Sequence, residues 1–161
     1  YENNSKANGY TEDDELGGKD PYSSSKACSE LITRAYRESF FKTDAVDRSK
    51  ISLSSIRAGN IIGGGDWAMY RLIPDSIRAF ETGNKLEIRY PNAVRPWQHV
   101  LDVVYALLHL VEKIIEDRSL DNQAWNVGPN QETVWSVEDV VRFFSKHCHH
   151  LPNNKYNQNL F

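Results

Sequence analysis

The sequence predicts an α/β protein, and three features support that fold class. Segments with apolar residues at helical spacing alternate along the chain with short extended segments. Two of the extended segments, 51–57 and 124–127, are apolar enough to predict buried strands. Four further segments have the length and the end signals of helices. Two strands make a small sheet, so we expect further strands of that sheet to lie outside these 161 residues.

The helices are placed by apolar spacing and by residues typical of helix ends. Pro21 favours a helix start, because its missing N–H would be unpaired there in any case. Gly83 is a typical stop signal, and residues 136–139 have the form of a capping box. The predicted helices span about 22–41, 72–82, 100–116 and 137–147.

The remaining segments are predicted to be extended or irregular. Short extended stretches are expected at 86–88 and 95–100. Three consecutive glycines at 63–65 disfavour regular structure around them. Residues 1–21 are polar and predict a loop, while the Asn-rich chain from 149 onward is expected to be poorly ordered.

Composition excludes several classes of partner. The 19 Lys and Arg residues are scattered and the net charge is −3, so neither a nucleic acid nor an anionic membrane is an expected partner. No apolar run approaches the ~20 residues that span a bilayer. The two cysteines, Cys28 and Cys148, form no disulfide framework, which indicates a cytoplasmic protein.

Tyr22 and Lys26 are the first candidates for chemistry. Residues four apart share one face of a helix, so the phenol and the ammonium are expected to meet over one site. Oxidation of a hydroxyl carbon needs a base that takes the O–H proton, and a nearby ammonium or nicotinamide cation favours the phenolate. The alternative is a helix that carries Tyr and Lys at this spacing by chance, since both residues are common.

A glycine-rich segment and an arginine supply two further candidates. Asn60 follows the predicted strand 51–57, and ligands of α/β sheets lie beyond the carboxyl ends of strands. The glycines at 63–65 would let backbone N–H groups approach a phosphate or a sugar, although a flexible surface turn is the alternative. Arg95 offers a fork of donors for a diphosphate, or equally one side of a surface ion pair.

A metal site at residues 147–150, which are three histidines and one cysteine, is not expected. Adjacent side chains point in different directions, and no second Cys/His cluster offers the remaining ligands. A solvated helix end is the better interpretation.

Four stretches together resemble the sugar-nucleotide dehydratases of the extended short-chain dehydrogenase/reductase family. They are 16–26, 57–75, 95–101 and 124–129, in the order of that family, and the resemblance extends from residue 1 to about 147. The family's G-x-x-G-x-x-G dinucleotide fingerprint and its Ser/Thr-Asp-Lys/Glu run are absent from the sequence, which also starts with Tyr1. We therefore expect the chain to be the C-terminal part of a longer protein.

The resemblance implies an NAD-dependent lyase that converts a nucleotide-linked glucose into a 4-keto-6-deoxy sugar in deoxysugar biosynthesis. Tyr22 would be the catalytic base on the 4-hydroxyl, and Lys26 would assist it and hold the nicotinamide ribose. Cofactor contacts are implied for Tyr22, Lys26 and Arg57. Substrate contacts are implied for Asn60, Arg71, Leu72 and Arg95. The family also implies a homodimer for the full-length protein.

The resemblance divides the chain into parts of two domains. Residues 1–60 would be the second half of an NAD-binding domain with a Rossmann-type parallel sheet, and 96–128 its last helix and strand. Residues 61–95 would be a substrate-binding segment, and 129–161 a remnant of the small substrate-binding domain with a polar tail. The isolated chain is expected to be inactive. Two alternatives stay open, another epimerase or dehydratase of the same family and a non-catalytic remnant that oligomerises.

Overall fold

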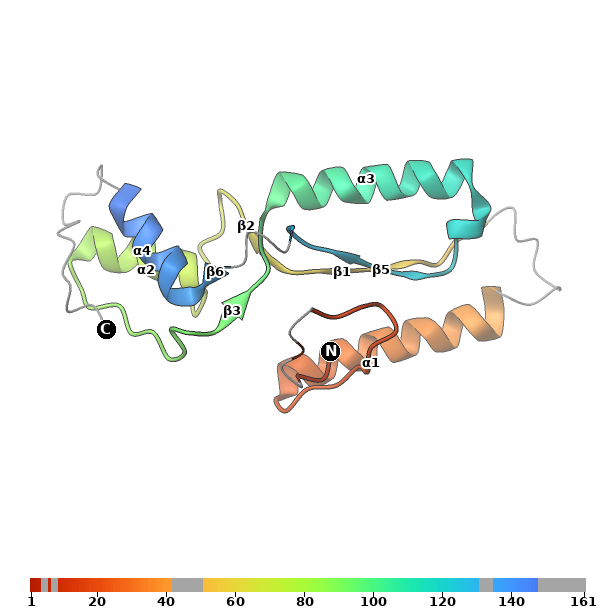
Figure 1. Ribbon diagram of the computed structural model, residues 1–161, viewed down its shortest axis with the longest axis horizontal. Helices are drawn as coiled ribbons and strands as arrows, with labels where there is room; N and C mark the ends of the chain where they lie inside the picture. The colour runs from red at the N-terminus through yellow and green to blue at the C-terminus, as the bar shows by residue number, and fades with distance from the viewer. Residues whose placement is uncertain (4–5, 7–8, 42–50, 131–134, 148–161) are drawn as a thin grey trace. The chain divides into compact units, whose positions relative to one another are not determined.

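The computed structural model describes residues 1–3, 6, 9–41, 51–130 and 135–147. The chain divides into two compact units, whose elements are labelled in Figure 1. The first unit comprises Tyr1–Ala58 and Tyr105–Val127, and the second comprises Gly59–Val104 and Gly128–Phe161. The chain therefore passes between the units three times, and one of these passages lies within a helix.

A parallel pair of strands forms the centre of the first unit. β1 (Ser55–Ala58) pairs with β5 (Ala124–Val127), so that Ser55 lies opposite Ala124. The crossover between them contains α3 (Val100–Glu116) and a short 3-10 turn, η2 (Arg118–Leu120). Helix α1 (Pro21–Tyr36) continues as a π-helical turn, η1 (Arg37–Phe41). Figure 1 shows β1 and β5 between α1 and α3, which confirms the predicted α/β layering.

The second unit packs two helices together beside two short strand pairs. Its helices are α2 (Leu72–Thr82) and α4 (Val137–His147). β2 (Asn60–Ile62) runs parallel to β4 (Trp97–His99), and β3 (Val94–Arg95) runs antiparallel to β6 (Trp135–Ser136). The core of this unit consists of Ala79, Phe80, Leu86 and Val141, with Leu72, Ile88 and Phe144 packed against it.

The helices lie where the sequence predicts them, because their apolar spacing and caps are strong local signals. α2, α3 and α4 have the predicted bounds, and α1 follows the prediction as far as Tyr36, beyond which the chain is π-helical. The capping box before α4 is confirmed: the backbone N–H of Asp139 donates to Ser136 Oγ at 3.1 Å. In return, the N–H of Ser136 donates to the Asp139 carboxylate at 3.2 Å.

The strand predictions are less accurate. β1 begins at Ser55 rather than at residue 51. Before Ser55, a side chain takes the place of backbone pairing between strands, because the N–H of Leu53 donates to Asn122 Oδ1 at 3.1 Å. The stretch 86–88, predicted to be extended, belongs to none of the described helices or strands, and Leu86, 6% exposed, packs in the core. Strands β2 and β6 are not predicted from the sequence. Residues from 148 onward, where the sequence predicts poor order, lie outside the described part of the chain.

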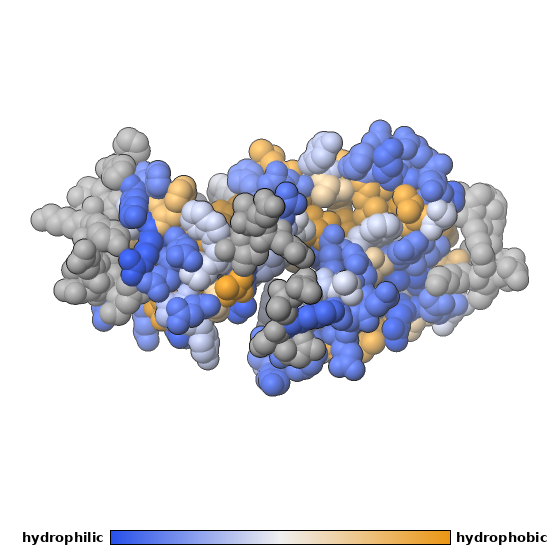
Figure 2. All heavy atoms as spheres, in the orientation of Figure 1, coloured by the Kyte–Doolittle hydropathy of each residue, from blue (hydrophilic) through white to orange (hydrophobic). Residues whose placement is uncertain are grey.

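The part of helix α3 in the first unit carries large apolar side chains that remain exposed. Figure 2 shows apolar residues at the surface over this helix. Its exposed large apolar side chains include Tyr105, Leu107, Leu108, Val111 and Ile115. Ile114, by contrast, is 7% exposed and faces the unit's interior. Among the residues that the structure describes, no helix has both the length and the apolar character needed to cross a membrane.

Replacement of Phe80 by alanine is expected to destabilise the 161-residue chain by about 3–5 kcal/mol, because the ring is 4% exposed and its removal leaves a cavity. Urea unfolding followed by circular dichroism measures the loss. Phe143→Ala is the matched control, since this ring on α4 is 50% exposed. Equal losses in the two variants would contradict the core assigned to the second unit.

Candidate functional site

The start of helix α1 is fixed by the side chain of Asp20. Its carboxylate accepts hydrogen bonds from the backbone N–H groups of Tyr22 and Ser23, both at 3.0 Å, and one from the Ser23 hydroxyl. The Ser23 hydroxyl, followed by the Ser23 backbone N–H, lowers the pKa of Asp20 below its usual value of 3.8. The turn before it also requires glycine, because a Cβ at Gly18 would lie 2.2 Å from Ser23 Oγ. These contacts hold the first helical turn, which carries Tyr22.

Tyr22 and Lys26 converge on one face of α1, as their spacing predicts. The Lys26 ammonium lies 5.7 Å from the centroid of the Tyr22 ring, within the range of a cation–π contact. Tyr22 is 63% exposed and Lys26 is exposed as well, so a ligand can reach both side chains. The arrangement suits a phenol that exchanges a proton next to a positive charge, while the catalytic roles of the two residues stay predictions.

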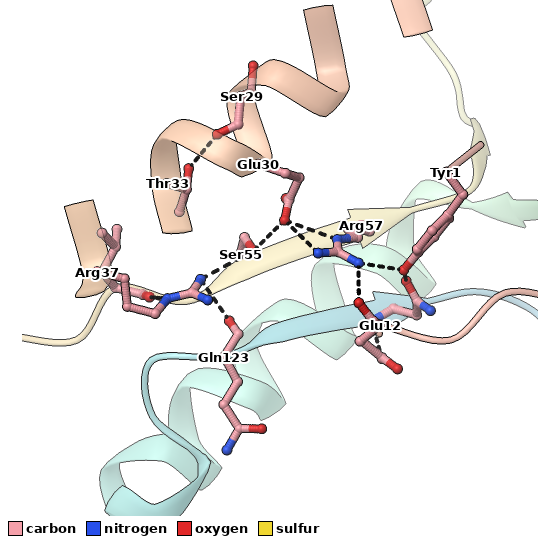
Figure 3. Close-up of polar contacts among 11 residues, drawn as sticks. Tyr1, Glu12, Ser29, Glu30, Thr33, Arg37, Ser55, Arg57 and Gln123 are labelled. Atoms are coloured by element: carbon pink, nitrogen blue, oxygen red, sulfur yellow. Dashed lines mark hydrogen bonds and ion pairs between the residues drawn. The ribbon is translucent and has the colours of Figure 1, made fainter. Parts of the chain in front are cut away.

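Arg57, whose predicted contact with the cofactor stays a prediction, lies in a network of protein groups (Figure 3). Its Nε and Nη2 donate to Glu30 Oε2 at 3.0 and 2.9 Å. Its Nη1 donates to the Tyr1 hydroxyl at 2.8 Å and to the Glu12 carbonyl at 2.9 Å. Burial acts to lower the pKa of Arg57, but the hydrogen bonds to Tyr1 and Glu30 outweigh it and raise that pKa. The guanidinium thereby joins β1, α1 and the N-terminal segment.

Arg37 makes the complementary connection from the helix to the strands. It is 7% exposed, and its Nε donates to the Leu53 carbonyl at 2.8 Å. Its Nη2 donates to the Gln123 carbonyl at 3.2 Å and to Ser55 Oγ at 3.5 Å. Burial lowers the pKa of Arg37, which the nearby carboxylates of Glu30 and Glu38 oppose. Arg37 thus connects the residues that precede β1 and β5 to the C-terminal end of α1.

A hollow of about 900 Å³ in the first unit lies beside this network. Acidic side chains of residues 12–15 line it, together with Arg34, Arg37 and Arg57. Trp125 also lines it, and the buried indole N–H of Trp125 has no acceptor among the described residues. Glu30 lines it as well, whereas Tyr22 and Lys26 are not among the lining residues, so the hollow does not extend along α1 as far as that pair.

The predicted substrate residues all lie in the second unit. Asn60 begins β2 opposite Trp97 of β4, and Arg95 in β3 is two residues before Trp97. Arg71 is the N-cap residue of α2, and Leu72 is its first helical residue. The side chains of Asn60, Arg71 and Arg95 are exposed, whereas Leu72 packs partly against the core. Their roles in substrate binding stay predictions.

The glycines of the second unit have two different functions in the fold. A Cβ at Gly59 would lie 2.4 Å from the Pro96 carbonyl, and a Cβ at Gly63 would lie 2.6 Å from the Val100 side chain. These two glycines therefore permit the close approach of β2 to the β4 segment. Gly64 and Gly65 have no neighbour within 4 Å of such a Cβ, and Gly65 has a φ of 83°. Of these four glycines, Gly64 and Gly65 leave backbone open to a ligand.

The residues after the glycines are held by Arg78 of α2. Its Nη1 donates to the Trp67 carbonyl at 3.0 Å, and its Nη2 donates to the Ala68 carbonyl at 3.2 Å. Tyr70, 84% exposed, adopts a left-handed φ of 63°, a conformation that is uncommon for a residue other than glycine. The exposed Tyr70 ring therefore lies next to a segment that Arg78 holds in place.

The possible metal cluster at 147–150 lies mostly outside the described residues. His147 is described, and its Nδ1 lies 2.7 Å from the Phe143 carbonyl. Within the described residues, no group of three or more His, Cys, Asp or Glu side chains is arranged to hold a metal ion.

Sequence reasoning missed several residues that organise the site. They are Tyr1, Glu12, Glu30, Arg37 and Arg78. A local signal existed only for Glu30, which lies four residues after Lys26 on the same face of the helix. The others act over separations in sequence that no spacing pattern encodes.

Comparison with known proteins connects this geometry to a family. The model of the NAD dependent epimerase/dehydratase family matches residues 1–128. A curated CDP-glucose 4,6-dehydratase of Salmonella typhimurium is 43% identical over 141 residues, which are 88% of this chain and 39% of that protein.

Solved structures give the same picture of the fold. A dTDP-glucose 4,6-dehydratase of Bacillus anthracis in complex with NAD has a TM-score of 0.63 and 26% identity, over 83% of this chain and 38% of that one. MoeE5 in complex with UDP-glucuronic acid and NAD has a TM-score of 0.64 and 28% identity, over 84% of this chain and 41% of that one. The predicted Rossmann-type α/β fold is confirmed, and the chain spans about two fifths of the length of these relatives.

The start of α1 is expected to depend on pH through Asp20. Because the pKa of its carboxyl is lower in the folded chain, the cap stabilises the helix above the unfolded value near 3.8 and is lost as pH falls through the folded value. Hydrogen-exchange protection of the Tyr22 and Ser23 amides measures the effect. Asp20→Ala should show reduced protection and no such transition, whereas Asp13→Asn should behave as the native chain. A transition that persists in Asp20→Ala would contradict the assignment.

Proposed function

Because the chain belongs to the NAD dependent epimerase/dehydratase family, we propose that it forms part of an enzyme that dehydrates CDP-glucose to CDP-4-keto-6-deoxyglucose. The similarity to the Salmonella typhimurium dehydratase over 88% of the chain supports the choice of reaction. The segment Gly63–Ala68 followed by Arg71–Asp75 favours a CDP-linked sugar within the family. The observation that carries the proposal is the exposed Tyr22–Lys26 pair at the fixed start of α1.

Tyr22 and Lys26 are assigned the proton chemistry of this reaction. Bound NAD would supply a hydride acceptor for C4 of the glucose and, after loss of water across C5 and C6, a hydride donor for C6, so the reaction would have no net redox change. The Tyr22 phenolate takes the proton of the 4-hydroxyl as the carbonyl forms. The Lys26 ammonium stabilises the phenolate charge and donates hydrogen bonds to the nicotinamide ribose.

The residues of this chain suit only one end of an NAD molecule. The reachable Tyr22–Lys26 pair fits the nicotinamide end, where the proton is exchanged. The 161 residues contain no G-x-x-G-x-x-G segment to hold the dinucleotide phosphates. Arg57 fits a cofactor contact poorly, because hydrogen bonds to protein atoms already engage four of its five N–H groups. We therefore expect that the chain alone neither binds NAD nor turns over CDP-glucose.

The substrate's nucleotide diphosphate is assigned to the second unit. Asn60, Arg71, Leu72 and Arg95 are the proposed contacts. Support comes from their positions, since neither Arg71 nor Arg95 is paired with a carboxylate of another described residue. A guanidinium without an internal counter-ion is available to a phosphate.

The whole protein is proposed to be a cytoplasmic homodimer. The exposed apolar side chains of α3 support the association, because such a face favours burial against another surface and a second copy of the protein would supply one. The same helix face would serve a non-catalytic oligomerising protein, but such a protein would have no use for the Tyr22–Lys26 arrangement. A different sugar nucleotide is the remaining alternative within the family, since those enzymes share Tyr22, Lys26 and Asn60.

The proposal predicts that a chimera turns over CDP-glucose when residues 1–147 of this chain replace the matched region of the Salmonella typhimurium dehydratase. In that chimera, Tyr22→Phe should lower kcat by about 10²–10⁴-fold, because the proton acceptor is removed. Assays with CDP-, dTDP- and GDP-glucose, followed by detection of the 4-keto-6-deoxy product, measure both effects.

Tyr36→Phe is the matched control, since this tyrosine lies on the same helix and is 55% exposed. Its activity should equal that of the parent chimera. Retention of more than about a tenth of the activity by Tyr22→Phe would contradict the role of Tyr22. If the chimera prefers dTDP-glucose or GDP-glucose, that sugar nucleotide would replace CDP-glucose as the proposed substrate.

A further inference from the structure

Glu30 continues the helix face that carries the proposed catalytic pair. Tyr22, Lys26 and Glu30 follow one another at intervals of four residues, so all three lie along one side of α1. Glu30 Oε2 accepts hydrogen bonds from Arg57 Nε, Arg57 Nη2 and Ser55 Oγ at 3.0, 2.9 and 3.1 Å. One oxygen atom therefore joins this side of the helix to strand β1.

We infer that the Glu30–Arg57 ion pair is a positioning device that sets where the Tyr22–Lys26 pair meets its ligand. The inference rests on the function proposed above, and it assigns Arg57 to the support of α1 rather than to the cofactor. Neither residue touches the reacting atoms in this scheme. Both act through the placement of the helix that carries the base.

The surroundings of the ion pair make it an effective anchor. The side chains of Arg57 and Glu30 are 15% and 19% exposed, so water and salt screen their attraction less than that of a surface pair. The Tyr1 hydroxyl and the Glu12 carbonyl occupy the other side of the guanidinium, which prevents it from swinging away from the helix. Removal of one partner would leave the other charge partly buried without its counter-ion.

A second anchor makes the position of α1 unique. Arg37 lies seven residues after Glu30, about two helical turns further along, and donates to carbonyl groups next to β1 and β5. One anchor would let the helix pivot, whereas two anchors at different heights fix its rotation and its tilt. Glu30 is the anchor nearer to the catalytic pair.

The distance from the anchor to the base amplifies small movements. Tyr22 lies eight residues before Glu30, or about 12 Å along the axis at ~1.5 Å per residue. A tilt of about 5° at Glu30 thus moves Tyr22 by about 1 Å, and an error of that size in a reacting group costs about 10²-fold in rate. Loss of the ion pair should therefore affect catalysis more than ligand binding.

The first test measures the anchor in the 161-residue chain without any activity. Hydrogen-exchange protection across α1 should fall by about tenfold or more in Glu30→Gln and in Arg57→Lys, and no further in the double variant, because both changes break one contact. Arg34→Gln is the control, since it removes an exposed charge from the same helix and leaves the ion pair intact. Unchanged protection of α1 in Glu30→Gln would overturn the inference.

The second test measures positioning in the chimera with the Salmonella typhimurium dehydratase. Glu30→Gln should lower kcat by about 10²-fold with a change in KM below about threefold. Arg34→Gln should leave kcat and KM unchanged.

The two tests separate this inference from the proposed function. A parent chimera without turnover would refute the function, and hydrogen exchange in the 161-residue chain would then decide whether Glu30–Arg57 anchors α1. Reduced protection combined with unchanged kcat in Glu30→Gln would show that the pair only stabilises the fold, which overturns its role in positioning.

Discussion

Two arginines cross between helix α1 and the β1–β5 pair in opposite directions, and the arrangement of the first unit depends on them. Arg37 extends from the helical side to the carbonyls of Leu53 and Gln123, and Arg57 extends from β1 to Glu30 on the helix. A sheet of two short strands buries little apolar surface, so packing alone defines the position of a neighbouring helix poorly. The directional, charge-assisted hydrogen bonds of the two arginines therefore fix the position of α1 relative to β1 and β5.

The two guanidiniums avoid the cost of burial in different ways. Arg37 has carbonyl and hydroxyl acceptors rather than a bound carboxylate, and burial lowers its pKa. Arg57 has a carboxylate, and its hydrogen bonds more than offset the effect of burial on its pKa. Both remain charged at physiological pH, because an arginine pKa lies far above that range. The contacts of α1 therefore persist under all conditions in which the proposed enzyme would work.

The sequence predicts the helices and the meeting of Tyr22 with Lys26 because these depend on local spacing. It predicts the strands less well, since β2 and β6 have three and two residues and are too short to show an alternating pattern. The Glu30–Arg57 contact is also hidden from spacing, because the two residues are 27 positions apart. Glycine shows the same limit: Gly63 and Gly65 look alike in the sequence, but one packs against Val100 and the other turns the chain.

The difference between sequestered and open guanidiniums has a consequence for the chemical reactivity of the chain. The donors of Arg37 and Arg57 are directed into protein acceptors, whereas Arg71 and Arg95 extend from an exposed helix start and an exposed strand. Dicarbonyl reagents condense with guanidinium nitrogens that solvent can reach. They should therefore modify Arg71 and Arg95 well before the two structural arginines, and a nucleotide diphosphate that occupies the second unit should shield those same two side chains from the reagent.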